Sequence, residues 1–83
     1  MTEYQVKVYS DGRQEWFLNG KRHRIDGPAV IESDGTQYWY KNGKLHRTDG
    51  PAVIYSDDTG EYWINNKHYE TELEYVIALG KPK

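Results

Sequence analysis

An internal repeat with a period of 23 residues constrains the fold of this chain more than any other feature. Ser10-Asp11-Gly12 returns as Ser33-Asp34-Gly35 and, in altered form, as Ser56-Asp57-Asp58. The first two copies also share longer segments, namely Asn19-Gly20-Lys21 with Asn42-Gly43-Lys44, His23-Arg24 with His46-Arg47, and Asp26-Gly27-Pro28-Ala29-Val30-Ile31 with Asp49-Gly50-Pro51-Ala52-Val53-Ile54. A fixed period of about 20 to 50 residues is typical of an array of stacked supersecondary units.

Each copy carries the turn signals of a β-hairpin. Asn19-Gly20 and Asn42-Gly43 interrupt alternating polar and aromatic residues, and Asn-Gly favours a type I′ turn because both central positions need a positive φ. The Ser-Asp-Gly segments predict a second turn in each copy, in which the aspartate side chain accepts a hydrogen bond from the backbone ahead of it. The sequence therefore predicts a mainly β protein, an antiparallel meander of about six or seven short strands.

The chain is short enough for one domain only, so we take residues 1–83 as a single domain. Its predicted parts are repeat 1 (about 9–31), repeat 2 (32–54), a degenerate repeat 3 (55–70) and a capping helix (71–80). Trp16 recurs as Trp39, whereas Trp63 falls one residue off the period. We therefore expect an extra residue at Asp58 or Thr59 and a compensating loss further along the third copy.

After the third copy the pattern changes to that of a helix. Thr71 and Glu74 form a Thr-x-x-Glu capping box, and Gly80 ends the segment. The apolar residues of this segment are Leu73, Val76, Ile77 and Leu79. Because an array of hairpins leaves an open edge at its end, we expect the helix to pack over the last hairpin as a lid.

Composition excludes several classes of protein. The chain has no cysteine, so it can form neither a disulfide framework nor a thiolate zinc site. No apolar run approaches the roughly 20 residues of a membrane span, and the first residues do not resemble a signal peptide, so we expect a cytoplasmic protein without membrane contact. The net charge of −2 gives no overall attraction to nucleic acid.

The unit Trp39-x-x-Asn42-Gly43-Lys44-x-His46 resembles the MORN repeat, a 23-residue hairpin unit that stacks into an elongated, twisted sheet. The longer string from Tyr38 to Ala52 is similar to a MORN variant of small bacteriophage and giant-virus proteins. The resemblance covers residues 9 to 70 and implies a scaffold or interaction role, since such repeats are mostly protein-binding and dimerising units. The phage likeness further implies an inhibitor of a host or defence protein.

Aromatic and basic residues are the candidate partner-binding groups. A single sheet has two faces that one helix cannot cover, so several aromatic side chains should stay partly exposed. Basic residues follow the Asn-Gly turns and acidic residues occupy the Ser-Asp turns, so stacking should separate a basic margin from an acidic one. We predict that the partner-binding residues are Trp16, Tyr38, Trp39, Tyr40, Lys21, Arg24, Lys44 and Arg47. The competing explanation is that the aromatics build the core and that arginines stack on them.

Two His/Asp pairs recur, His23 with Asp26 and His46 with Asp49. A metal site or an acid–base pair is one explanation, but zinc usually takes three or four ligands, and the third copy has Tyr69 at the histidine position. We favour a structural role, with histidine bridging strands and aspartate accepting backbone N–H groups, because each repeat must satisfy the same turn. We predict no catalytic residue, no metal and no cofactor.

The sequence therefore predicts a non-enzymatic protein-binding module. The resemblance narrows this to a phage-encoded inhibitor that acts in the host cytoplasm by covering the surface of a host or defence protein, with a homodimer as one arrangement. The alternative is a nucleic-acid or nucleotide-binding protein that uses the basic margin. A third alternative is a small metal-dependent enzyme at His23 and His46.

Overall fold

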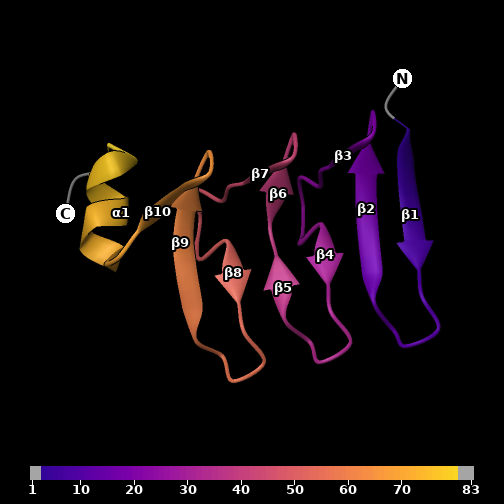
Figure 1. Cartoon of the computed structure of the whole chain (residues 1–83). Helices are drawn as coiled ribbons and strands as arrows, with labels where there is room; N and C mark the ends of the chain where they lie inside the picture. Colours follow the sequence, from indigo (N-terminus) through magenta and orange to yellow (C-terminus); the bar gives the residue numbers. More distant parts are fainter. Residues whose placement is uncertain (1–2, 81–83) are drawn as a thin grey trace.

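The computed structural model describes residues 3–80, which form a mainly antiparallel β-sheet followed by one short C-terminal helix (Figure 1). The strand segments are β1 (Tyr4–Val8), β2 (Gln14–Leu18), β3 (Lys21–Arg22), β4 (Val30–Ile31), β5 (Gln37–Tyr38), β6 (Tyr40–Lys41), β7 (Lys44–Leu45), β8 (Val53–Ile54), β9 (Gly60–Ile64) and β10 (Lys67–Tyr69). The helix is α1 (Glu72–Ala78). The predicted fold class, mainly β with a C-terminal helix, is confirmed.

The strands lie side by side in nearly the order in which they occur along the chain (Figure 1). The main sheet has the order β1-β2-β4-β5-β8-β9-β10, with β3 also paired to β2, while β6 and β7 pair with each other. Two loops interrupt the strands, a first loop (residues 23–29) between β3 and β4 and a second loop (residues 46–52) between β7 and β8. These two loops, together with a break at Trp39 between β5 and β6, explain why the described residues contain ten strand segments where we predicted about six or seven.

The Ser-Asp turns have one geometry in all three copies. The same backbone hydrogen bond of 2.8 Å closes each turn and joins Tyr9 to Arg13, Glu32 to Thr36 and Tyr55 to Thr59. The aspartate side chain of each turn accepts a bond from the backbone two residues ahead, as predicted. Asp58 has a φ of 71°, in the place where Gly12 and Gly35 have 93° and 92°. The expected extra residue in the third turn is therefore wrong.

The third copy keeps the 23-residue spacing and changes which residue occupies each position. The Arg24 N–H donates to the Tyr40 carbonyl at 3.2 Å, and the Arg47 N–H donates to the Trp63 carbonyl at 3.1 Å. Trp63 therefore lies where Tyr40 lies in the preceding copy, and Tyr62 lies where a tryptophan would be expected. The turn spacing sets the register, so moving a tryptophan by one residue along the strand moves it to the opposite face of the sheet.

The Asn-Gly turns adopt the predicted positive φ at both central positions, with 52° and 79° at Asn19 and Gly20. In the third copy Asn66 replaces glycine at a φ of 70°. Its side-chain oxygen accepts a hydrogen bond of 2.8 Å from the Leu45 N–H, and its own N–H donates to the Leu45 carbonyl at 2.9 Å. The asparagine thus fits the left-handed position and also ties the last turn to the preceding hairpin.

The core of the sheet is small. Its buried apolar side chains are Ala29, Val30, Ala52 and Val53, to which α1 adds Tyr75. Eight aromatic residues in the strands and beside them are partly or fully exposed, namely Trp16, Phe17, Tyr38, Trp39, Tyr40, Tyr55, Tyr62 and Trp63. The extents of 42 × 34 × 17 Å describe a thin, broad molecule. The predicted exposure of several aromatics is confirmed.

The helix begins and ends where the sequence places it, but it packs through another residue than expected. The Thr71 hydroxyl accepts a 3.1 Å hydrogen bond from the Glu74 N–H, as its capping role predicts. Tyr75 is the buried residue of α1, whereas Leu73 and Ile77 are 47% and 62% exposed. The lid position is confirmed by ring contacts of Tyr75 with β9 and β10. Of the apolar positions named from the sequence, Val76 and Leu79 are half-buried, and Leu73 and Ile77 are not part of the packed side.

We predict that Asp58→Gly stabilises the protein by about 0.5 kcal/mol, because glycine removes the cost of a left-handed residue and loses part of that gain as unfolded-chain entropy. Urea unfolding measures the difference. The control is Asp57→Ala in the same turn, which removes hydrogen bonds to the Thr59 N–H and hydroxyl and should destabilise by about 1 kcal/mol. Equal loss of stability in both variants would contradict the conclusion that Asp58 occupies the left-handed glycine position of the turn.

Candidate functional site

The predicted partner-binding residues lie on two opposite faces of the sheet. Successive side chains of a strand point to opposite faces, so Tyr38 and Tyr40 share one face and Trp39 lies on the other. The rings of Tyr38 and Tyr40 are 6.5 Å apart. We call the side with Trp16 and Trp39 the tryptophan face and the side with Tyr38 and Tyr40 the tyrosine face. The eight candidate residues therefore do not form one patch.

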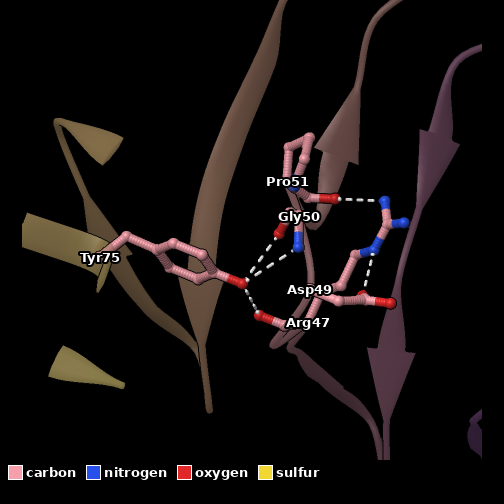
Figure 2. Close-up of polar contacts among 5 residues, drawn as sticks. All are labelled: Arg47, Asp49, Gly50, Pro51 and Tyr75. Atoms are coloured by element: carbon pink, nitrogen blue, oxygen red, sulfur yellow. Dashed lines mark hydrogen bonds and ion pairs between the residues drawn. The ribbon is translucent and has the colours of Figure 1, made fainter. Parts of the chain in front are cut away.

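On the tryptophan face, each loop lies against its own hairpin through an arginine. The Arg24 guanidinium is 4.1 Å from the centre of the Trp16 ring, and the Arg47 guanidinium is 3.8 Å from that of Trp39. In the second loop the Arg47 Nε donates to Asp49 at 2.8 Å, and its Nη1 donates to the Pro51 carbonyl at 3.1 Å (Figure 2). These guanidinium groups therefore hold the loops in place.

The first loop is built in the same way, with Arg24 contacting Asp26 at 3.3 Å and the Pro28 carbonyl at 3.2 Å. The side chains of Arg24 and Arg47 are only 26% and 19% exposed. Of the four basic residues predicted to bind a partner, Lys21 and Lys44 are exposed. Both follow Asn-Gly turns, which lie at one end of the strands, and the Ser-Asp turns lie at the opposite end (Figure 1). We call the margin of the sheet formed by the Asn-Gly turns the basic edge.

Tyr75 closes the tryptophan face at the C-terminal end of the array. Its ring lies 4.6 Å from that of Tyr62, and its hydroxyl donates to the carbonyls of Arg47 and Gly50, at 2.5 and 3.0 Å (Figure 2). The same hydroxyl accepts a 3.3 Å bond from the Gly50 N–H. Burial raises the pKa of Tyr75, so the phenol stays protonated as a donor. The helical spacing of apolar residues does not point to Tyr75, because tyrosine also occurs on exposed helix faces.

The two histidines bridge neighbouring hairpins. The Nδ1 of His23 accepts a 3.0 Å hydrogen bond from the Asn42 N–H, and the Nδ1 of His46 accepts a 3.1 Å bond from the Asn65 N–H. Each histidine therefore fixes the Asn turn of the next copy along the chain. This geometry agrees with the structural role and needs a neutral imidazole with its proton on Nε2.

The tyrosine face contains a buried carboxylate. Glu15 is 6% exposed and accepts hydrogen bonds from the Tyr9 hydroxyl at 2.6 Å and from Arg22 at 2.9 Å. The bond from Tyr9, helped by Arg22, lowers the pKa of Glu15 below its ordinary value. A shallow hollow of about 320 Å³ next to this group is lined by Arg13, Tyr38 and Tyr40 among others. Glu15 and Glu32 balance the charges of Arg13 and Arg22 around the hollow, so it has no strong preference for an ion of either sign.

A second hollow, of about 350 Å³, lies on the tryptophan face between the two loops. Residues 23–25 of the first loop and residues 46–49 of the second loop line it, with Trp39 and Lys41 between them. We call it the loop pocket. Ile25 is 76% exposed at its margin. The loop pocket thus combines an indole ring, an exposed aliphatic side chain and the backbone of two loops.

Residues 3–80 contain no cluster of three or more histidine, cysteine, aspartate or glutamate side chains that could hold a metal ion. Nor does this part of the chain have a helix with the length and apolar character that a membrane crossing needs. Neither protein-family models, nor curated proteins, nor solved structures match the chain.

We predict that Tyr75→Phe destabilises the protein by about 1 to 2 kcal/mol, because the carbonyls of Arg47 and Gly50 lose their donor while the ring contacts remain. Thermal and urea unfolding measure the loss. Ile77→Ala is the matched control on the exposed side of α1 and should change stability by less than about 0.5 kcal/mol. If Tyr75→Phe left the stability unchanged, the hydroxyl would not be what holds the second loop.

The hydrogen bond to His46 predicts a pH dependence of stability. Burial, followed by the charge of Lys41, lowers the pKa of His46 below its ordinary value of 6.5. A base with a lowered folded-state pKa contributes stability above the unfolded-state pKa and loses it as the pH falls below that value. We expect the protein to exceed His46→Gln in stability by about 1 kcal/mol at pH 7.5 and the gap to close towards pH 5. Unfolding curves at both pH values test this, and a gap independent of pH would contradict it.

Proposed function

We propose that this chain is a non-enzymatic protein-binding module of the MORN-like hairpin-repeat type. The observation that carries the proposal is the partial or full exposure of the eight aromatic residues named above, in a molecule only 17 Å thick. Tyrosine and tryptophan at the surface supply large contact areas at a low cost in conformational entropy and are enriched at the energetic centres of interfaces. A rigid sheet that presents such residues on both faces is suited to protein binding.

The rigidity of the aromatic faces supports this function. Backbone hydrogen bonds recur in each copy, the histidines tie each hairpin to the next, and arginines fix the loops against the tryptophans. A surface that is already ordered loses little conformational entropy when it binds, so more of the contact energy contributes to affinity. Exposed Lys21 and Lys44 at one edge would steer the module towards an acidic partner.

We propose that the module acts by surface occlusion. The broad face has extents of 42 and 34 Å, enough for the roughly 800 Å² that each partner contributes to a standard interface. The resemblance to small phage proteins favours an inhibitor of a host or defence protein, working in the host cytoplasm. Such a role needs a stable surface that is complementary in shape to the partner, and it needs no catalytic group.

A nucleic-acid-binding function is the second candidate, because basic and aromatic residues adjoin at one edge. Lys21, Arg22, Phe17 and Tyr40 line a common shallow hollow there. Aromatic rings beside cations are the groups that bind single-stranded nucleic acid. Arg24 and Arg47, which this alternative also needs, are engaged by their own loops, so it depends chiefly on the lysines.

We expect the tagged protein to retain one stoichiometric protein from a bacterial lysate at both low and moderate salt, because apolar contacts resist salt. Mass spectrometry identifies the partner. Baits carrying Tyr38→Ala or Ile25→Ala test the two faces separately, and Lys21→Ala with Lys44→Ala tests the basic edge. Circular dichroism confirms that each bait is folded.

The salt arm separates the two candidate functions. Phosphate contacts release counterions, so a nucleic-acid complex should dissociate at moderate salt and in the double lysine variant. Recovery of nucleic acid alone, lost at moderate salt, would overturn the protein-binding proposal. Recovery of a protein that no face variant releases would contradict the role of the aromatic faces.

A further inference from the structure

The two terminal strands of the sheet differ in how they are covered. At the C-terminal side, α1 packs beside β10 through the ring of Tyr75 (Figure 1). At the other side the last strand is β1, which pairs with β2 alone. Every residue of β1 is exposed, and no other part of residues 3–80 pairs with this strand. An exposed terminal strand is a template for pairing with another strand.

The hydrogen bonds of β2 show which backbone groups of β1 face the open side. The Trp16 N–H donates to the Ala29 carbonyl at 2.7 Å, and the Trp16 carbonyl accepts from the His23 N–H at 3.2 Å. Both groups of Trp16 therefore point away from β1. Val6 lies opposite Trp16, so this pair exchanges no hydrogen bond, and the N–H and C=O of Val6 point outward. The residues two positions before and after Val6 point the same way, because the pattern alternates along the strand.

The residues whose backbone faces the open side also carry apolar side chains. They are Tyr4, Val6 and Val8, which are 37%, 48% and 70% exposed. Their side chains lie on the tryptophan face, because Val6 is directly opposite Trp16 and residues two apart share a face. The open side of β1 thus combines unpaired backbone groups with a row of exposed apolar side chains.

β1 lacks the features that keep strand edges apart in other proteins, which include bulges, prolines and charged side chains that project across the edge. It pairs with β2 in an unbroken register and contains no proline. Its one charged residue, Lys7, places its ammonium group 5.0 Å from the centre of the Phe17 ring, over the neighbouring strand β2. β1 is therefore open to a second strand.

We propose that two copies of this chain pair antiparallel through β1, with the two-fold axis between their Val6 residues. In this register Val6 lies opposite the partner's Val6, and Tyr4 lies opposite the partner's Val8. All the outward N–H and C=O groups of β1 are then paired, in about six hydrogen bonds. Lys7 lies opposite the partner's Gln5. An axis at Lys7 would instead place two ammonium groups directly opposite each other, and an axis at Gln5 would leave Val8 without a partner in β1.

A second copy fits this edge because β1 is complementary to itself. Opposite residues of an antiparallel pair share a face, so the apolar rows of the two copies lie side by side, and the two tryptophan faces form one continuous surface. The dimer joins the two sheets at the end that α1 does not cover. The inference stands apart from the proposed function, since none of the residues varied in the lysate experiment belongs to β1.

The first test is sedimentation velocity of the intact protein. One strand edge buries less area than a standard interface, so we expect a reversible monomer–dimer equilibrium between roughly 5 and 500 µM. With rising concentration, the NMR signals of the Val6 and Val8 amides should shift and gain protection from hydrogen exchange. The amides of Gln5 and Lys7 already bond to β2 and should gain little. A protein that stays monomeric throughout this range, or a dimer that leaves the Val6 and Val8 amides unchanged, would overturn the proposal.

Charge substitutions at the axis test the register. Val6→Lys should weaken dimerisation at least roughly fivefold, because it places two ammonium groups opposite each other. Leu73→Lys on α1 is the matched control, since Leu73 is 47% exposed and Val6 is 48% exposed, and it should leave dimerisation unchanged. An equal mixture of the Val6→Lys and Val6→Glu variants should associate more tightly than either variant alone, because an ammonium group then faces a carboxylate. Undiminished dimerisation of Val6→Lys, or a mixture no tighter than its components, would overturn the proposed pairing.

Discussion

Stacking of an arginine from each loop on the tryptophan of its own hairpin is the interaction on which the tryptophan face depends. A single sheet has no second layer to cover its aromatic side chains, and the guanidinium groups of Arg24 and Arg47 supply that cover from within the repeat. The same groups bond the loop carbonyls, so the loops are ordered by the residues that they bury. The third copy has Glu70 at this position, and Tyr75 from α1 takes over the stacking role.

This arrangement decides which basic residues can meet a partner. Four cations beside the Asn-Gly turns look equivalent in the sequence. The two arginines, however, contact tryptophan rings and loop carbonyls of their own copy, whereas Lys21 and Lys44 stay exposed. The aromatic residues are divided as well, because alternation along the strand sends Trp39 to one face and its neighbours Tyr38 and Tyr40 to the other. A partner therefore meets either an aromatic face with loops or a face of tyrosines around a buried carboxylate.

Hydrogen bonds between successive copies join the hairpins of the thin sheet. His23 and His46 each accept a bond from the turn of the following copy, and Asn66 returns one to the copy before it. In an array whose units contact only their neighbours, such contacts supply the coupling between units that a deep core supplies in other proteins. Among residues 3–80, the strands and loops bury only four small apolar side chains, so these polar contacts add to a small apolar core.

The sequence by itself determined the local structure: turns at Asn-Gly and Ser-Asp, the period of 23 residues, the mainly β class and the helix capped by Thr71. These follow from backbone preferences of a few residues, which act over short distances. It did not reveal the register of Trp63 or the packing of Tyr75, and it assigned Arg24 and Arg47 to a free margin. Only the tertiary structure decided these, because they depend on which groups meet across hairpins. The loop pocket likewise exists only where two loops approach each other over Trp39.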